Sequence, residues 1–146
     1  MIEQVYNHTA QRGDKPIHTL AIESSCDETA VAILKSEAGK VHILADIIHS
    51  QIEDHKPYGG VVPEIAARAH ADIVDRLVLD ALDTAKIDPE SLDVIGATSG
   101  PGLIGGLLVG LMTGKALAMA LNIPFLPINH LEAHALSPRI TQDCPF

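Results

Sequence analysis

The sequence has few aromatic, cysteine and basic residues. It contains no Trp, two Tyr, two Phe and two Cys among 146 residues. Two cysteines cannot build the disulfide framework of a small secreted domain, so a reducing compartment is expected. The 10 Lys and Arg residues are outnumbered by 19 Asp and Glu, giving a formal net charge of −9. Because phosphate binding depends on clustered cations, this balance excludes a basic nucleic-acid clamp made from these residues alone.

The sequence also lacks an uninterrupted apolar run of membrane-spanning length. Lys115 interrupts the most apolar stretch, residues 102–121, whereas a spanning helix needs about 20 predominantly apolar residues. Residues 1–16 are polar and mixed, without the apolar core of a signal peptide. We therefore expect no membrane span and no export segment. Residues 102–121 are predicted to contain a buried helix of a soluble protein.

Hydrophobic residues make up 47% of the sequence, and the mean hydropathy is +0.20. This content is too high for a disordered protein and sufficient for one ordinary domain with a core. Residues 1–16 show no apolar period and are predicted to form a flexible tail. Residues 17–146 contain no linker and are predicted to form one lobe.

The apolar periodicity predicts a mixed α/β pattern. Three short apolar runs separated by polar turns favour consecutive antiparallel strands, and helices then alternate with strands. Pro63 suits a first helical turn, and Pro138 is expected to end or kink the last helix. The predicted strands cover 17–25, 30–34, 41–51, 94–100 and 123–129, and the predicted helices cover 64–86, 103–121 and a segment from 130.

The first candidate site is the segment from Glu23 to Thr29, where a strand ends in small polar residues. Hydroxyls and free backbone N–H groups at a tight turn can hold phosphate oxygens, and an acid such as Asp27 can hold a cation. An ordinary hairpin turn is the alternative. Cys26 is a candidate nucleophile, but no His is near it in sequence, which favours a buried or spectator thiol.

The second candidate is the glycine-rich segment 98–106, where a strand leads into a helix. Such a turn can gather N–H donors for an anion, although the segment matches neither a P-loop nor a dinucleotide-binding fingerprint. Gly106, Gly110 and Gly114 then recur every four residues. This spacing is typical of close helix packing and also suits contact with a partner helix.

The third candidate is the pair His130 and His134, which share one face of a predicted helix. Two imidazoles at this spacing can bind one metal ion. The alternative is a pair of helix-start histidines, one capping and one solvated. A complete metal site needs a further ligand, for which Glu23, Asp27 and a residue beyond Phe146 remain open. Four other histidines show no ligand spacing and are predicted to be structural or solvated: His42, His49, His55 and His70.

Four segments in register resemble the TsaD family of tRNA threonylcarbamoyladenosine transferases, formerly called Gcp or O-sialoglycoprotein endopeptidase. The resemblance covers residues 18–140. It is carried by LAIESSCDETAVAI, SQ…HKPYGGVVPEIAARAH, TSGPGLIGGLLVGLMTGKALA and NHLEAH. It implies one lobe of the actin, hexokinase and Hsp70 fold, with a nucleotide cleft between two lobes. The second lobe lies outside these residues.

The resemblance implies transfer of a threonylcarbamoyl group from threonylcarbamoyl-adenylate to N6 of adenosine 37 in tRNAs that read ANN codons. His130 and His134 match the metal-binding histidines, with one Fe²⁺ or Zn²⁺ per full-length subunit. Ser25, Cys26, Asp27, Glu28 and Thr29 match the phosphate-side loop that faces threonylcarbamoyl-adenylate or ATP. Ala133 replaces the Gly common between the two histidines, which should not block metal binding.

The resemblance also implies partners: the inactive paralogue TsaB, the ATPase TsaE, and tRNA bound through the full complex. It implies a cytoplasmic protein, with the mitochondrial matrix as the other compartment. Since the third metal ligand, an Asp, belongs to the missing lobe, the chain alone is expected to fold without catalysing. Two other functions remain: a paralogue-binding module that associates through its helices, and a metallopeptidase. The order His-x-Glu-x-His argues against the latter because the Glu points away from the metal face.

Overall fold

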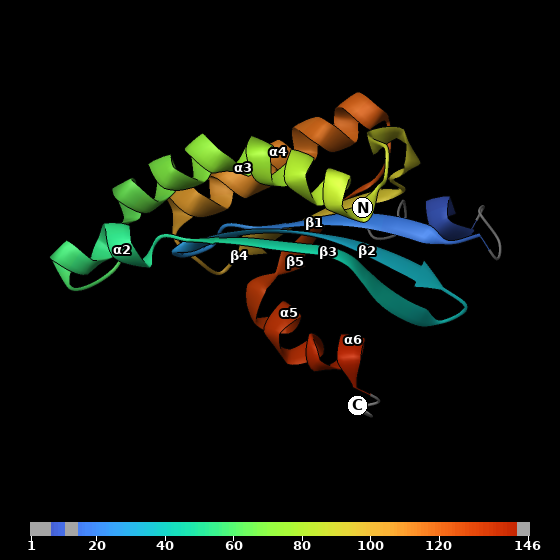
Figure 1. The fold of residues 1–146 in the computed structure, drawn as a ribbon, viewed down its shortest axis with the longest axis horizontal. Helices are drawn as coiled ribbons and strands as arrows, with labels where there is room; N and C mark the ends of the chain where they lie inside the picture. Colours follow the sequence, from blue (N-terminus) through green and yellow to red (C-terminus); the bar gives the residue numbers. More distant parts are fainter. Residues whose placement is uncertain (1–6, 11–14, 143–146) are drawn as a thin grey trace.

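The computed structural model describes residues 7–10 and 15–142, which form a five-stranded sheet with helices on both faces (Figure 1). The strand order is β3-β2-β1-β4-β5. The strands are β1 Ile17–Glu23, β2 Glu28–Glu37, β3 Lys40–Ser50, β4 Val94–Gly100 and β5 Phe125–Asn129. The helices are α2 Ile52–His55, α3 Pro63–Ala85, α4 Ile104–Leu121, α5 His130–Leu136 and α6 Pro138–Thr141.

The first three strands form an antiparallel meander, as the sequence predicts. The turn between β2 and β3 is tighter than expected, because both strands extend to leave only Ala38 and Gly39 between them. Both residues have positive φ, the conformation of the two-residue hairpin turn that matches strand twist. The predicted six-residue turn is therefore wrong, and four of its residues belong to the strands.

The other two strands join the sheet in parallel, β4 beside β1 and β5 beside β4, each after a crossover helix. As a result β1, β4 and β5 all end at the same edge of the sheet. In open α/β sheets, ligands bind outside the carboxyl ends of parallel strands. This topology brings the polar ends of three strands, far apart in the sequence, into one place.

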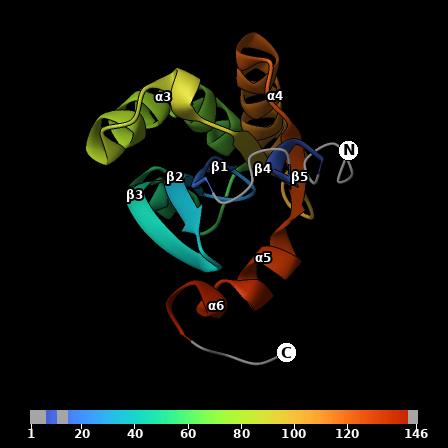
Figure 2. The ribbon, with the colours of Figure 1, turned by 90° about the vertical axis from the view of Figure 1, so that its right-hand side faces the viewer.

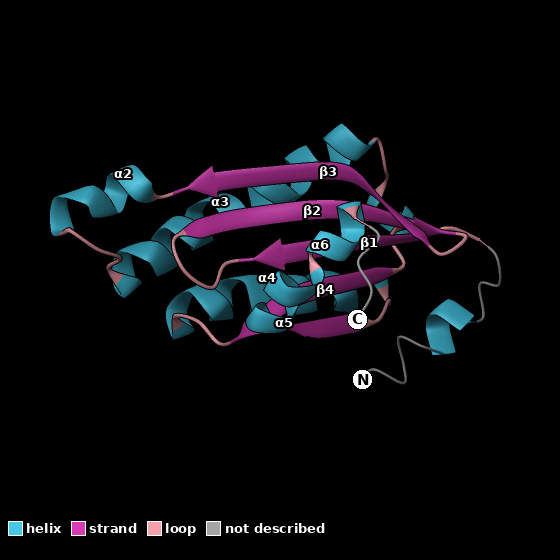
Figure 3. Ribbon diagram, turned by 90° about the horizontal axis from the view of Figure 1, so that it is seen from below, coloured by secondary structure: helices cyan, strands magenta, loops and turns pink. Residues whose placement is uncertain are grey.

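The two faces of the sheet differ in side-chain size. Leu20, Ile22, Val31 and Ile33 are buried beneath α3 and α4, which together cover one face (Figure 2). The alternate residues of β1 and β2 face the other side and include Ala21, Ala30 and Ala32, which are partly buried. The short helices α5 and α6 lie on that side (Figure 3). The period-2 pattern thus separates a bulky core from a floor of small residues.

The glycine stripe of α4 faces inward. Gly106, Gly110 and Gly114 are buried; a Cβ at Gly106 would overlap the Ser24 carbonyl oxygen, and one at Gly114 would lie 2.9 Å from the Phe125 ring. These glycines let the helix approach the sheet closely. The packing interpretation is therefore correct, and contact of this glycine face with a partner helix is wrong because the face is already occupied.

The opposite face of α4 is apolar and exposed. By length and composition α4 meets the criteria for a membrane span, yet it packs on the sheet and α3, with 28% of its residues buried inside the structure. The prediction of a buried helix is thus correct for one face only. Four large side chains lie on the exposed face: Ile104, Leu108, Met112 and Met119.

Two further segments differ from the predictions or fall outside the description. The segment between the predicted strand 41–51 and the predicted helix 64–86 contains α2 and the 3-10 turn Lys56–Tyr58. Residues 7–10 of the predicted tail form a helical turn. The remainder of that tail at 1–6 and 11–14, and the end of the predicted lobe at 143–146, lie outside the described residues.

Candidate functional site

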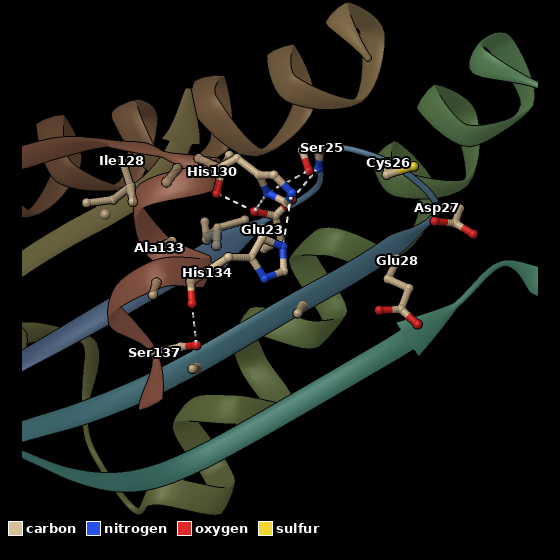
Figure 4. Close-up of a pocket in the computed structure, with 17 residues that line it drawn as sticks. Glu23, Ser25, Cys26, Asp27, Glu28, Ile128, His130, Ala133, His134 and Ser137 are labelled. Carbon is tan, nitrogen blue, oxygen red and sulfur yellow. Dashed lines mark hydrogen bonds and ion pairs between the residues drawn. The ribbon is translucent and has the colours of Figure 1, made fainter. Parts of the chain in front are cut away.

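A pocket of about 510 Å³ lies between the small-residue face of the sheet and α5 (Figure 4). This volume falls within the ordinary range for small-molecule sites. The alanines of β1 and β2 and Gly96 form its floor, and polar groups gather where the parallel strands end. The polar lining residues are Glu23, Ser25, Cys26, Asp27, Glu28, Thr98, His130, His134 and Ser137.

Glu23, the last residue of β1, accepts hydrogen bonds from three parts of the chain. Its carboxylate accepts the Ser25 backbone N–H at 2.6 Å and the Thr98 hydroxyl at the end of β4, and it lies 3.3 Å from His130 Nδ1. Burial would raise the pKa of Glu23, but the hydrogen bonds from Ser25, Thr98 and His130 outweigh it and lower that pKa below its usual value. A charged, oriented carboxylate therefore stands beside the imidazole.

His130 and His134 lie on one face of α5, as their spacing predicts. Their Nε2 atoms are 3.1 Å apart, and the rings meet edge to face at 86°. The alternative that His130 caps the helix is wrong, because the cap is Asn129, whose side chain accepts the backbone N–H groups of Leu131 and Glu132. His130 instead turns its Nδ1 toward Ser25 Oγ at 3.1 Å and the Glu23 carboxylate.

The pair fits half of a metal site. When Nδ1 of His130 donates to Glu23, its Nε2 presents a lone pair toward His134, so a proton or a cation must lie between the two nitrogens. Two nitrogen ligands of a tetrahedral Zn²⁺ are about 3.3 Å apart, close to the observed separation. A carboxylate on the far nitrogen is the usual outer-shell partner of a metal-bound histidine.

Within the described residues, no group of three or more His, Cys, Asp or Glu side chains is placed to hold a metal. Glu23 bonds to the outer nitrogen of His130 and so orients the ring rather than completing a three-ligand group. Asp27 lies on the pocket wall and does not complete one either. Of the further ligands considered from sequence, only a residue beyond Phe146 is left.

Four of the five predicted loop residues line the pocket: Ser25, Cys26, Asp27 and Glu28. Thr29 does not. It is fully buried on the opposite side of the sheet, where its Oγ1 lies 2.7 Å from His70 Nδ1. The loop therefore lines the pocket with its first four residues and is anchored in the core by Thr29.

Cys26 is exposed, so the expectation of a buried thiol is wrong. Partial desolvation and the neighbouring Asp27 carboxylate raise the pKa of the thiol above its usual value. A raised pKa reduces the thiolate fraction on which nucleophilicity depends. The environment of Cys26 favours a spectator role.

The glycine-rich segment 98–106 acts mainly in packing. Leu103 N–H donates to the Ser25 carbonyl at 2.7 Å, and a Cβ at Gly102 would come within 2.7 Å of Ser25. Thr98 is the residue of this segment that lines the pocket. The segment thus holds the backbone of the loop at Ser25 through the Leu103 hydrogen bond and the close approach of Gly102.

Sequence reasoning missed three contacts of the site. Thr98 donates to Glu23, and Gln51 and His70 hold the loop backbone from the core. The first was accessible from sequence, because two predicted strands end in small polar residues and parallel neighbours end at one edge. The others join residues far apart in the chain and have no periodic signal. His55 and His70 are buried and structural, and His42 and His49 are exposed, as predicted for this group.

Solved structures share this architecture. YeaZ from Pseudomonas aeruginosa superposes with a TM-score of 0.61 at 22% identity, covering 84% of this chain and 49% of that one. A second structure, described as similar to the peptidase YEAZ from the same organism, has a TM-score of 0.61 at 25% identity, covering 86% and 49%. Together with the strand order, this likeness confirms the predicted α/β fold, a lobe of the actin and hexokinase type.

Sequence comparisons identify the family. The model for TsaD, the tRNA N6-adenosine threonylcarbamoyltransferase, matches residues 42–146. The enzyme of that name from Bartonella bacilliformis is 59% identical over 128 residues, and that from Brucella ovis is 57% identical over 131 residues. These matches cover 87% and 89% of this chain but 35% and 36% of the relatives, so the chain spans about a third of their length. The chain belongs to the tRNA N6-adenosine threonylcarbamoyltransferase family.

Proposed function

We propose that this chain is the lobe of a threonylcarbamoyl transferase that holds the activated donor beside a metal ion. The observation that carries the proposal is the convergence of Glu23, Ser25 and the two α5 histidines at the carboxyl ends of three parallel strands. The reaction is transfer from threonylcarbamoyl-adenylate to N6 of adenosine 37 in tRNAs that read ANN codons. The remaining two thirds of the relatives' length would close the other side of the pocket.

The transfer needs positioning more than bond activation. N6 of adenosine attacks the carbamoyl carbon, a C–N bond forms, the C–O bond to phosphate breaks, and AMP leaves while N6 loses a proton. The donor is already activated by its phosphate leaving group. The protein must align the two reactants and keep water away from the carbonyl, which in general accounts for a large part of such rate enhancements.

The residues of the pocket divide this work. Ser25 and the following loop offer a hydroxyl and backbone N–H groups for phosphate oxygens. The alanine floor leaves room for a ligand and excludes water from the sheet face. Asp27 and Glu28 lie on the same wall, where carboxylates can hold the hydrated cation that accompanies a nucleotide.

His130 and His134 would hold one Fe²⁺ or Zn²⁺ together with a ligand from outside the described residues. When bound, the ion would polarise or orient the donor. Glu23 fixes the tautomer of His130 by accepting from Nδ1, which leaves Nε2 free to bind.

A chimera tests the proposal. Residues 15–142 would replace the matching segment of the Bartonella enzyme, and the product would be supplied with unmodified tRNA, ATP, threonine, bicarbonate and the other pathway proteins. We expect threonylcarbamoyladenosine by mass spectrometry from the chimera and none from the 146-residue chain. An inactive chimera that is folded and binds zinc, or turnover by the short chain, would contradict the two-lobe proposal.

A paralogue of the YeaZ type (TsaB) is the partner we propose for the exposed face of α4. Four large apolar side chains lie there, and an exposed apolar stripe of this kind marks an interaction surface. YeaZ shares this fold, so a pseudo-symmetric pairing of like helices would cover the stripe on α4. This second function, a paralogue-binding module, does not require turnover.

Co-purification with the purified paralogue tests that surface. Met112→Asp should abolish the complex, since it places a charge at the centre of the stripe. Ile48→Asp is the matched control, because Ile48 on β3 is equally exposed, 58% against 57% for Met112. Equal binding by both variants would refute an α4 interface.

The other partners and the compartment follow from the same reaction. We propose that the ATPase TsaE joins the complex and that tRNA binds through the whole assembly, because the 19 acidic residues of this chain outnumber its 10 Lys and Arg residues. The cytoplasm, where tRNA is modified, is the proposed location, with the mitochondrial matrix as the alternative.

A further inference from the structure

A chain of hydrogen bonds runs through the interior beneath the loop that walls the pocket. Val62 N–H lies 3.3 Å from His55 Nδ1, and His55 Nε2 lies 3.1 Å from Gln51 Oε1. Gln51 Nε2 is 3.1 Å from His70 Nδ1, and His70 Nε2 is 3.2 Å from the Cys26 carbonyl oxygen. We name the three side chains in the middle, Gln51, His55 and His70, the relay.

The two ends of this series of hydrogen bonds determine which atom donates in each bond. A backbone N–H only donates, so the Val62 N–H requires His55 Nδ1 to accept and puts the His55 proton on Nε2. That proton goes to Gln51 Oε1, which leaves the Gln51 amide to donate to His70 Nδ1. His70 then carries its proton on Nε2 and donates it to the Cys26 carbonyl, which only accepts. Both ends therefore agree on one arrangement, with both imidazoles neutral.

The relay has little freedom to rearrange. Gln51 and His70 are fully buried, and His55 is 4% exposed. Thr29 Oγ1 reaches His70 Nδ1 at 2.7 Å, so the same nitrogen has a second donor nearby. A Cβ on Gly106 would lie 3.0 Å from the His70 ring, which shows how closely α4 confines it. Flipping the Gln51 amide would place its NH₂ group against the Nε2–H of His55, so that two donors would face each other.

The His70 side chain and the Gln51 backbone hold the backbone of the loop at consecutive residues. His70 binds the Cys26 carbonyl, and Gln51 N–H donates to the Asp27 carbonyl at 3.0 Å. The side chains of Cys26, Asp27 and Glu28 line the pocket on the other side (Figure 4). The loop is thus pinned from the core while its other side faces the ligand space.

We propose that the relay is a positioning device for the transfer reaction: it fixes the Cys26–Glu28 loop against the pocket without touching the ligand. For its effect on rate, the inference rests on the proposed function. Displacement of a positioning group by about 1 Å reduces a rate by about 100-fold. Loss of the His70 contact should therefore affect turnover although His70 lies behind the loop.

The activity test compares two buried residues one turn apart on α3. His70→Leu removes the donor to Cys26, while Val74→Ala removes packing in the same helix, at a site that is 5% exposed. In the active chimera we expect His70→Leu to lower kcat by about 10- to 100-fold, with Val74→Ala near the parent kcat at a similar fall in melting temperature. His70→Gln keeps a donor and should recover part of kcat.

The outcomes separate the two proposals. If the parent chimera is inactive, the proposed function fails. If the parent is active and His70→Leu keeps its kcat, the positioning role fails alone. An equal loss of kcat in His70→Leu and Val74→Ala would show that the relay only supports the fold, and it would refute the positioning role.

Two measurements on the 146-residue chain require no activity. The imidazole ¹⁵N shifts should show the Nε2–H tautomer for both His55 and His70, and an Nδ1–H tautomer in either would overturn the relay. Amide hydrogen exchange at residues 26–28 should accelerate at least 10-fold in His70→Leu, with a smaller change in His70→Gln and none in Val74→Ala. Unchanged exchange in His70→Leu would show that the loop does not depend on the relay.

Discussion

Two pairs of histidines in this lobe have opposite environments. His55 and His70 are buried, and each ring nitrogen faces a protein partner. His130 and His134 lie at a pocket, with two Nε2 atoms facing each other at 3.1 Å. In the first pair, both nitrogens of each ring bond to other protein groups in the core. In the second pair, the two Nε2 atoms bond to each other beside the pocket, so a metal ion can take the place of the proton between them. The difference lies in hydrogen bonding rather than in residue type.

The largest effect should come from breaking the pocket pair. In the active chimera, His134→Ala is expected to reduce turnover by at least ~100-fold, since even losing an outer-shell partner of a metal costs about 10- to 100-fold. Zinc binding measured by calorimetry should be lost, while stability should change by less than about 0.5 kcal/mol because His134 is exposed. The matched variant His55→Ala should reverse the pattern: zinc binding retained, stability lowered by about 1–3 kcal/mol. Similar results for both variants would contradict the difference in role between the pocket histidines and the buried histidines.

Next in size is the close approach that confines His70. Gly106→Ala should lower the free energy of unfolding by about 1–3 kcal/mol, because the added Cβ meets the Ser24 carbonyl and the His70 ring. Gly60→Ala is the control, since a Cβ there meets nothing within 4 Å. Urea unfolding of the 146-residue chain measures both. A neutral Gly106→Ala would mean that α4 can move away from the sheet at little cost.

A smaller effect is expected from Glu23, the outer partner of His130. Glu23→Gln keeps the shape but removes the charge, and it should weaken zinc binding by about 10-fold. Glu28→Gln removes a carboxylate from the same pocket without a contact to either histidine. Competition titration with a zinc indicator compares the two. Equal affinities in both variants would show that Glu23 does not tune the pair.

The smallest effect is a pH dependence of stability from His70. Burial lowers the pKa of His70 below its usual value of 6.5, against the opposing influence of the Cys26 carbonyl, Glu23 and Asp27. As pH falls below about 6.5, the unfolded chain therefore binds a proton before the folded chain does, and stability decreases. Above that pH the group makes no difference.

Urea midpoints between pH 7.5 and 5.5 test this slope. The parent chain should lose stability over the interval more steeply than His70→Gln, which has no imidazole at this position. Parallel slopes would mean that His70 titrates alike in both states. Zinc should be left out, because its binding to the pocket pair is itself pH-dependent.

Local periodicity predicted most of the fold because each element has its own signal. The short apolar run of β1 and the Pro63 start of α3 are examples, and the i, i+4 spacing placed His130 and His134 on one face. The relay could not be predicted in this way. Its contact between His70 and Cys26 joins residues 44 positions apart, and only the packing of α3 on the sheet brings them together. The sequence favoured a buried or a spectator thiol at Cys26, and its exposure could not be predicted because composition does not show which side of a turn faces outward.

The alanine floor has a consequence for how this lobe can diversify. Ala21, Ala30 and Ala32 face the pocket from strands whose opposite faces form the core, so their side chains set the depth of the pocket without supporting the sheet. Lengthening one of them would alter which ligand shapes fit while leaving the hydrophobic layer beneath α3 and α4 unchanged. Ligand selectivity and folding therefore depend on alternate residues of the same strands. Substitutions in the pocket-facing residues change selectivity without changing the core, and the reverse also holds.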